Sequence, residues 1–139
     1  MITAALLTKM AEDLSGITID QNAFWEELPL MKNGKPAQGI WIVTRGGWET
    51  NTKAINCQTT ADIYVAYNDK TKTEAVHADI SKWIRENRAI CELSGTIGDS
   101  RYDFTNVRIR PATTPSESGI TSNGNIVKIA SATIYYDIN

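Results

Sequence analysis

The sequence is poor in the residues that form disulfides and metal sites, with two cysteines and one histidine in 139 residues. Cys57 and Cys91 cannot form the disulfide framework of a small secreted domain. Together with His77 they fall short of the four ligands of a zinc site unless carboxylates join them. We therefore expect no metal, no cofactor and two reduced thiols that pack as small apolar groups.

Long apolar runs and a large excess of one charge are also missing. No apolar run approaches the ~20 residues of a membrane helix, and residues 1–11 lack the basic start and cleavage site of a signal peptide. Fourteen Lys and Arg face sixteen Asp and Glu, and this net charge of −2 is too balanced for general nucleic-acid binding. The sequence thus predicts a soluble, unsecreted protein that reads no nucleic acid and spans no membrane.

The remaining composition is ordinary for a globular protein, with 42% apolar and 22% charged residues. This length suits one domain over residues 1–139. Apolar residues at helical spacing predict helices over residues 2–14 and 71–87. In the second, Thr71 and Glu74 have the spacing of a capping box, and we expect Trp83 on its apolar stripe to anchor the helix on a sheet.

Strands are predicted from β-branched and alternating apolar residues. Residues 17–38 between them look like an aromatic-bearing connector and residues 44–56 like a polar loop. The strands cluster instead of alternating with helices, so we predict an α+β fold. We expect one largely antiparallel sheet of roughly four to five strands, flanked by an N-terminal helix and a central Trp-bearing helix. The predicted strands cover residues 39–43, 57–67, 89–93, 102–109 and 126–138.

Residues 111–125 are rich in Pro, Gly, Ser and Thr and include Pro115, Ser116, Glu117 and Gly119. This composition is typical of a loop that is mobile in the free subunit. Because a long structureless loop in a compact domain usually has a function, we expect it to become ordered on contact with a neighbouring subunit.

Charge is distributed unevenly along the chain. Residues 1–31 hold one Lys and five acidic residues, a net charge of −4, whereas the rest of the chain has a net charge of +2. Arg108 and Arg110 lie on one face of their predicted strand, away from its apolar side chains. Opposite signs favour head-to-tail contacts between copies, so we predict an interface that joins these arginines to Glu26 or Glu27 of the next copy.

Each candidate set of catalytic residues in the sequence is weak, and we predict a protein that is not an enzyme. A thiol catalyst built from His77 and Cys91 rests only on the presence of both residue types. The segment Arg45-Gly46-Gly47 lacks the context of a phosphate loop and is interpreted as a flexible strand end. The alternative from another class is a small hydrolase using His77 and Asp79, which requires both groups in one cleft.

The order of these elements resembles the minor capsid or tail terminator proteins of long-tailed bacteriophages. The resemblance rests on the N-terminal helix, a Gly-Ile-Trp-Ile-Val strand, an Ala-Asp-Ile-Tyr-Val-Ala-Tyr strand leading into the Trp-bearing helix, and a Ser/Thr-rich loop before the last Ile-rich strand. It covers nearly the whole chain and includes no invariant motif. The connector over residues 17–38 has no counterpart in this pattern.

The resemblance implies a structural protein without catalytic residues, which forms a hexameric ring that caps the finished tail tube and offers a docking surface to the head. The implied partners are further copies of the chain, the tail tube protein and a head-connector protein. The implied location is the tail or neck of the virion, after assembly in the host cytoplasm. A head-tail connector of the same module fits the same features and differs only in its partner.

Overall fold

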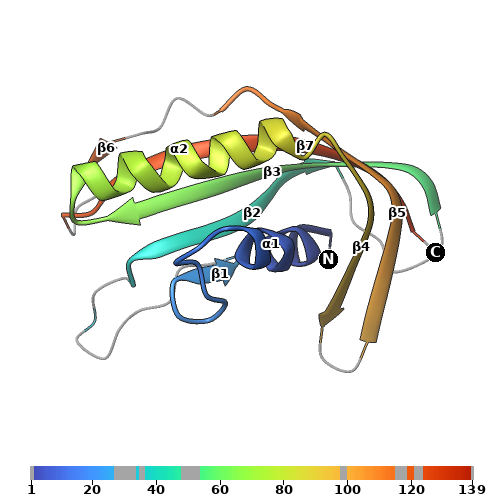
Figure 1. Cartoon of the computed structure of the whole chain (residues 1–139), viewed down its shortest axis with the longest axis horizontal. Coiled ribbons are helices and arrows are strands. Elements are labelled where there is room, and N and C mark those ends of the chain that lie inside the picture. The colour runs from blue at the N-terminus through green and yellow to red at the C-terminus, as the bar shows by residue number, and fades with distance from the viewer. Residues whose placement is uncertain are drawn as a thin grey trace.

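The computed structural model describes residues 2–26, 34, 37–47, 54–97, 100–114, 119–120 and 124–138. These residues form two helices and seven strands, and Figure 1 shows the strands as one curled sheet. In chain order the elements are α1 (Ile2–Asp13), β1 (Ala23–Trp25), β2 (Gly39–Gly47), β3 (Ala54–Tyr67), α2 (Lys70–Glu86), β4 (Ala89–Ile97), β5 (Ser100–Pro111), β6 (Gly119–Ile120) and β7 (Ile126–Ile138).

The strand order in the sheet is β1-β2-β3-β7-β5-β4, and β6 pairs with β7. The pair β1–β2 is parallel and the other pairs are antiparallel. The predicted α+β class and the two flanking helices are therefore confirmed, but the sheet has seven strands where roughly four to five were expected. The extra strands β1 and β6 have three and two residues. Two or three residues are too few to show the alternating pattern that predicts a strand. These segments form strands because they hydrogen-bond to a neighbouring strand.

Strand boundaries extend beyond the predicted ones for the same reason. Part of the predicted polar loop over residues 44–56 belongs to β2 and β3, and β4 continues past its predicted end at Leu93 as far as Ile97. Pairing with a neighbouring strand lets polar residues such as Ser94 and Thr96 extend a hairpin.

The predicted loop over residues 111–125 begins later than expected and contains the short strand β6. Pro111 belongs to β5, and Gly119 pairs with Val127 of β7. Pro115, Ser116 and Glu117 lie outside the described residues, so the prediction that this loop is mobile stays a prediction.

Helix α2 begins at Lys70, one residue before the predicted start. Its N-cap is Asp69, whose carboxylate accepts a hydrogen bond of 2.9 Å from the backbone N–H of Thr71. The predicted capping box of Thr71 and Glu74 is therefore wrong. An aspartate at the N-cap satisfies the same free N–H groups without help from the third residue of the helix.

The core lies between the sheet and the two helices. Helix α2 packs on β3, β5 and β7, whereas α1 contacts β1, β2 and β4. Because β1 and β4 end the strand order, contact of α1 with both shows that the sheet curls around this helix. The largest fully buried side chains are Tyr136, Phe104, Ile2, Leu6, Met10, Ile40, Ile42, Ile63, Ile80, Ile109, Ile134 and Val65.

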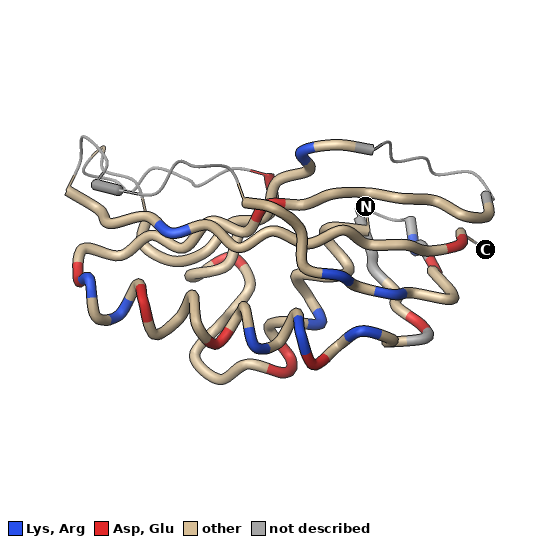
Figure 2. Tube along the Cα trace, turned by 90° about the horizontal axis from the view of Figure 1, so that it is seen from above, with Lys and Arg blue, Asp and Glu red and all other residues tan. Residues whose placement is uncertain are grey.

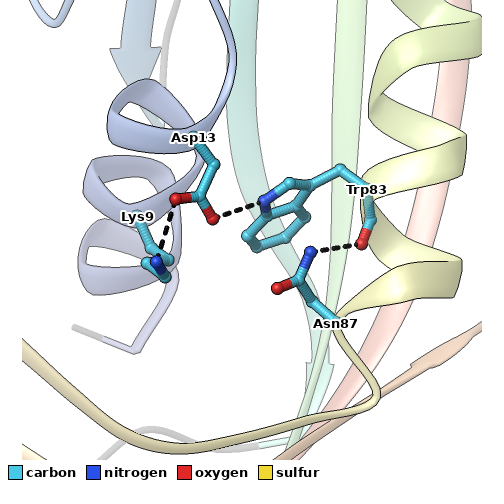
Figure 3. Close-up of polar contacts among 4 residues, drawn as sticks. All are labelled: Lys9, Asp13, Trp83 and Asn87. Carbon is cyan, nitrogen blue, oxygen red and sulfur yellow. Dashed lines mark hydrogen bonds and ion pairs between the residues drawn. The ribbon is translucent and has the colours of Figure 1, made fainter.

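Trp83 joins the two helices. Its side chain is 4% exposed, and its indole N–H donates a hydrogen bond of 2.9 Å to the carboxylate of Asp13 in α1 (Figure 3). The prediction that Trp83 anchors α2 in the core is confirmed.

Strand β7 lies in the middle of the sheet, and the apolar residues on both of its faces predict a strand that is covered on both sides. Its central residues 129–132 are all buried, whereas the flanking residues alternate. A second, smaller apolar cluster lies apart from the main core and includes Val127 and Ile129, with the stacked rings of Trp41 and Tyr64 packed against it. The prediction therefore holds for the middle of the strand.

A candidate interaction site at the sheet bend

The sheet bends where β3 and β5 each carry an extra residue relative to β7. The register shifts between Ala54 and Cys57 in β3, and between Thr105 and Arg108 in β5. An extra residue bends a strand and increases its twist. Figure 1 shows the β4–β5 hairpin turned across the end of the sheet, with α1 beside it.

Two asparagines at these bulges have left-handed backbone. Asn56 in β3 has a φ of 56° and Asn106 in β5 a φ of 52°. Asparagine adopts this conformation more readily than most residues, although at some cost in energy. Backbone strain of this kind is concentrated at functional sites, so the bend is a candidate site.

One carboxylate, that of Asp137 in β7, holds both bulges. One of its oxygens accepts a hydrogen bond of 2.8 Å from the backbone N–H of Asn56, and the other accepts one of 2.7 Å from the Asn106 amide. The bond from Asn106, followed by that from Asn56 and the charge of Arg108, holds the pKa of Asp137 below its ordinary value of 3.8. The ionised carboxylate therefore stabilises the bend.

A pocket of about 450 Å³ opens at the bend. Arg108 is exposed at this pocket, and its guanidinium carbon lies 5.7 Å from the centroid of the Tyr135 ring. Ile55, which precedes Asn56, has a side chain that is 77% exposed. Arginine beside apolar surface is typical of protein interfaces. The pocket, called the bend pocket below, is lined by Asn56, Ala89, Asn106, Val107, Arg108 and Asp137.

The predicted arrangement of the two arginines on β5 is confirmed at the level of the strand. Arg108 and Arg110 are exposed, whereas Val107 and Ile109 are buried. Their surroundings differ, however. Arg110 donates from Nη1 to the backbone carbonyls of Arg88 and Ile109, at 3.1 and 3.0 Å. Of the two predicted interface arginines, Arg108 lines the bend pocket.

Of the two predicted acidic partners, Glu26 lies at the other end of the strand order. Glu26 directly follows β1, is exposed, and has a φ of 71°. Its backbone N–H donates to the carbonyl of Ile42 at 2.8 Å, which fixes the position of this residue beside β2. Glu27 lies outside the described residues.

His77 and Asp79 line separate pockets. His77 borders a groove of about 240 Å³ between α2 and β7, and its Nε2 donates to the backbone carbonyl of Ile129 at 3.0 Å. Asp79 lines a different pocket of about 440 Å³, which also contains Asp13 and Trp83. In the described part of the chain, these two pockets do not supply the single cleft that the hydrolase alternative requires.

The two cysteines and the acidic residues also belong to the residue types that bind metal ions. Cys57 is buried, and this burial, with the negative charge of Asp137 as a smaller cause, raises the pKa of its thiol. The side chain of Cys91 lies outside the described residues. Among the residues that the structure describes, no group of three or more His, Cys, Asp or Glu is placed to hold a metal ion. Within the same residues no helix is both long and apolar enough to cross a membrane.

Arg45 has a structural partner at the end of β2, where Arg45-Gly46-Gly47 was predicted to be a strand end. These residues belong to β2, and Arg45 Nε lies 3.1 Å from a carboxylate oxygen of Asp62. Asp62 is 3% exposed and also accepts a hydrogen bond from the Ser131 hydroxyl. A buried carboxylate requires such partners, so the arginine neutralises a charge within the sheet.

Sequence reasoning missed most of the bend pocket. Asn56 lay in a predicted loop, and Asn106 lay within a predicted strand between residues of β character. An asparagine inside a strand pattern is a signal for a bulge, since it tolerates left-handed backbone. The pattern contains no signal that both bulges meet at Asp137, because that depends on which strands are neighbours.

Figure 2 shows charges of both signs mixed along the helical side of the molecule, with no broad field of one sign among the described residues. The arrangement at the bend is therefore better suited to a local contact than to long-range capture of a polyanion. In comparisons with known proteins, no family model, no curated protein and no solved structure matches this chain.

Proposed function

We propose that this chain is a structural virion protein that assembles into a ring, caps the tail tube of a long-tailed phage and joins it to the head. Self-assembly is its activity in this proposal, and its binding surfaces take the place of a catalytic site. The proposal starts from the order of elements along the chain, with a helix first, a Trp-bearing helix in the middle and an Ile-rich strand last.

The observation that carries the proposal is the position of the two oppositely charged regions. Arg108 lies on β5, next to the edge strand β4, whereas Glu26 follows the opposite edge strand β1. Two different surfaces on one subunit can join head to tail, and such a contact closes into a ring when the rotation between subunits allows it. A self-complementary patch would instead stop at a dimer.

Electron microscopy of the purified protein, alone and mixed with tail tubes, tests the proposal. We expect rings of one size that sit on the end of a tube. Protein that remains a monomer at high concentration and does not bind tube ends would contradict it.

The second candidate, a head-tail connector, is separated by adding isolated head portals to the same experiment. Rings that bind isolated head portals and ignore tail tubes would identify the connector. The head-to-tail contact between subunits is common to both candidates, so this outcome would change the partner and leave the assembly mechanism in place.

A further inference from the structure

We propose that the bend pocket binds one corner of a second copy of this chain. In this contact, Glu26 of one copy pairs with Arg108 of the other, and Ile19 and Trp25 of the first copy pack against Ile55 of the second. The corner is the segment from Thr18 to Glu26, between α1 and β2 in sequence. This inference rests on the proposed ring and specifies the residues that form its contact.

The exposed large apolar side chains lie in the corner and next to the bend pocket. Among the described residues, the exposed large hydrophobic side chains are Ile19 and Trp25, each 37% exposed, and Ile55 at 77%. Ile19 and Trp25 belong to the corner, and Ile55 precedes the Asn56 that lines the bend pocket. Each place thus combines apolar surface with a charge, which is the composition of the centre of an interface.

Backbone strain is a second, independent observation that points to the corner and the bend pocket. In the described part of the chain, the non-glycine residues with positive φ are Asp20, Glu26, Asn56 and Asn106. The first two belong to the corner, and the other two line the bend pocket. Strained residues persist where the surrounding structure holds them and are frequent at binding sites.

The corner is held rigid by its own hydrogen bonds. The side chain of Asn22 accepts from the backbone N–H of Thr18 and donates to the carbonyl of Gly16, both at 2.7 Å. The indole N–H of Trp25 donates to the Thr3 hydroxyl at 2.8 Å. A segment already fixed in its bound shape loses little entropy on association, so it is suited to enter a preformed pocket.

The corner supplies carboxylates, and the lining of the bend pocket includes a cation, Arg108. The corner carries Asp20 and Glu26 and belongs to the N-terminal part of the chain, whose net charge is −4. In the bend pocket, both oxygens of Asp137 accept hydrogen bonds from the asparagines of the same subunit, and Arg108 is the cation. The guanidinium of Arg108 beside Tyr135 can form a charge-assisted hydrogen bond with a carboxylate. Its flat face can also stack on an aromatic ring.

The occupant is a second copy and not the same subunit, because the two places lie apart in the molecule. Figure 1 places the start of β3 and the C-terminus at one side of the molecule, well away from β1. The contact therefore joins unlike surfaces, so assembly continues beyond a dimer until it closes.

A charge exchange tests the pairing of Arg108 with Glu26. Arg108→Glu and Glu26→Arg should each weaken self-association about thirtyfold, as expected for a contact at the centre of an interface, and the double variant should recover most of the loss. Analytical ultracentrifugation measures the association. Arg85→Glu, an equal change on the exposed side of α2, should leave it unaltered. Circular dichroism and the melting temperature confirm that each variant is folded.

A cross-link tests the contact without weakening it. In the double variant Ile19→Cys with Ile55→Cys, neither replaced side chain is buried. Mild oxidation should produce a ladder of dimers, trimers and larger species, whereas each single variant should not produce one. A band that stops at the dimer, or no cross-link at all, would overturn the inference.

The outcomes separate this inference from the proposed function. Rings that form normally in each single charge-reversal variant, and that give no cross-link between the introduced cysteines, would overturn the inference and leave the ring in place. A parent protein that stays monomeric at every concentration would overturn both.

Discussion

Two aspartates, Asp13 and Asp137, connect segments that are far apart in the sequence, and their settings differ. Asp13 in α1 accepts hydrogen bonds of 2.9 Å from Lys9 and from the Trp83 indole of α2. Lys9 is the larger cause and Trp83 the second of the two bonds that hold the pKa of Asp13 below 3.8. Asp137 instead holds two bulges through neutral amide donors, beside an open pocket.

The difference lies in the donors and not in the carboxylates. At the junction of the helices the donors are the Lys9 ammonium and the indole N–H of the buried Trp83, and neither residue has a positive φ. At the bend the donors are Asn56 and Asn106, both in left-handed conformation and both lining a pocket. We infer that the first carboxylate stabilises packing, whereas the second preserves the shape of a binding surface.

The largest expected effect is at the junction of the helices. Trp83→Ala should lower the free energy of unfolding by about 3–5 kcal/mol, because it leaves a large cavity in the core. Chemical denaturation measures this loss. Trp83→Phe is the matched control, since it keeps most of the ring and removes the N–H, and it should cost about 1 kcal/mol for the lost hydrogen bond. A melting curve unchanged in Trp83→Ala would mean that this side chain does not anchor the core.

A smaller effect is expected at the bend. Asn106→Ala removes the hydrogen bond to Asp137 and places alanine in left-handed backbone, for a combined loss of about 2 kcal/mol. Asn106→Gly loses the same bond but tolerates the conformation, so it should be about 1 kcal/mol more stable than the alanine variant. Equal stabilities of the two variants would show that the bulge is not strained. If the bend shapes a binding surface, both should weaken self-association more than Trp83→Phe does.

The smallest effect is the pH and salt dependence of the two carboxylates. Both have a pKa below 3.8 in the folded protein, so the stability they contribute is present above that value and is lost as the pH falls through the lower, folded one. Asp13→Asn and Asp137→Asn should therefore be less stable than the parent at neutral pH, and this difference should shrink in acid. Added salt should weaken the contribution of Asp13 more, because its first partner is the charged Lys9. Urea titrations across pH and salt measure both, and identical salt responses would contradict the comparison.

Residue patterns alone determined the two helices, the class of the fold and the buried position of Trp83. Each depends on local spacing, because the apolar side of a helix or strand repeats with its own period. The alternation in β5 likewise placed Arg108 and Arg110 outside and Val107 and Ile109 inside. Charge distribution singled out Glu26 for the same reason, since it is a property of neighbouring residues in the chain.

Only the tertiary structure decided which strands are neighbours and what those neighbours complete. β1 exists because the edge of β2 accepts it, and the bulges at Asn56 and Asn106 meet because β3 and β5 flank β7. Asp137 reaches both bulges although they lie far from each other in the sequence. Such contacts depend on the pairing of strands that are far apart in the sequence. No periodic pattern in the sequence predicts this pairing. The arginine was therefore visible in the sequence, whereas its pocket was formed by the curl of the sheet.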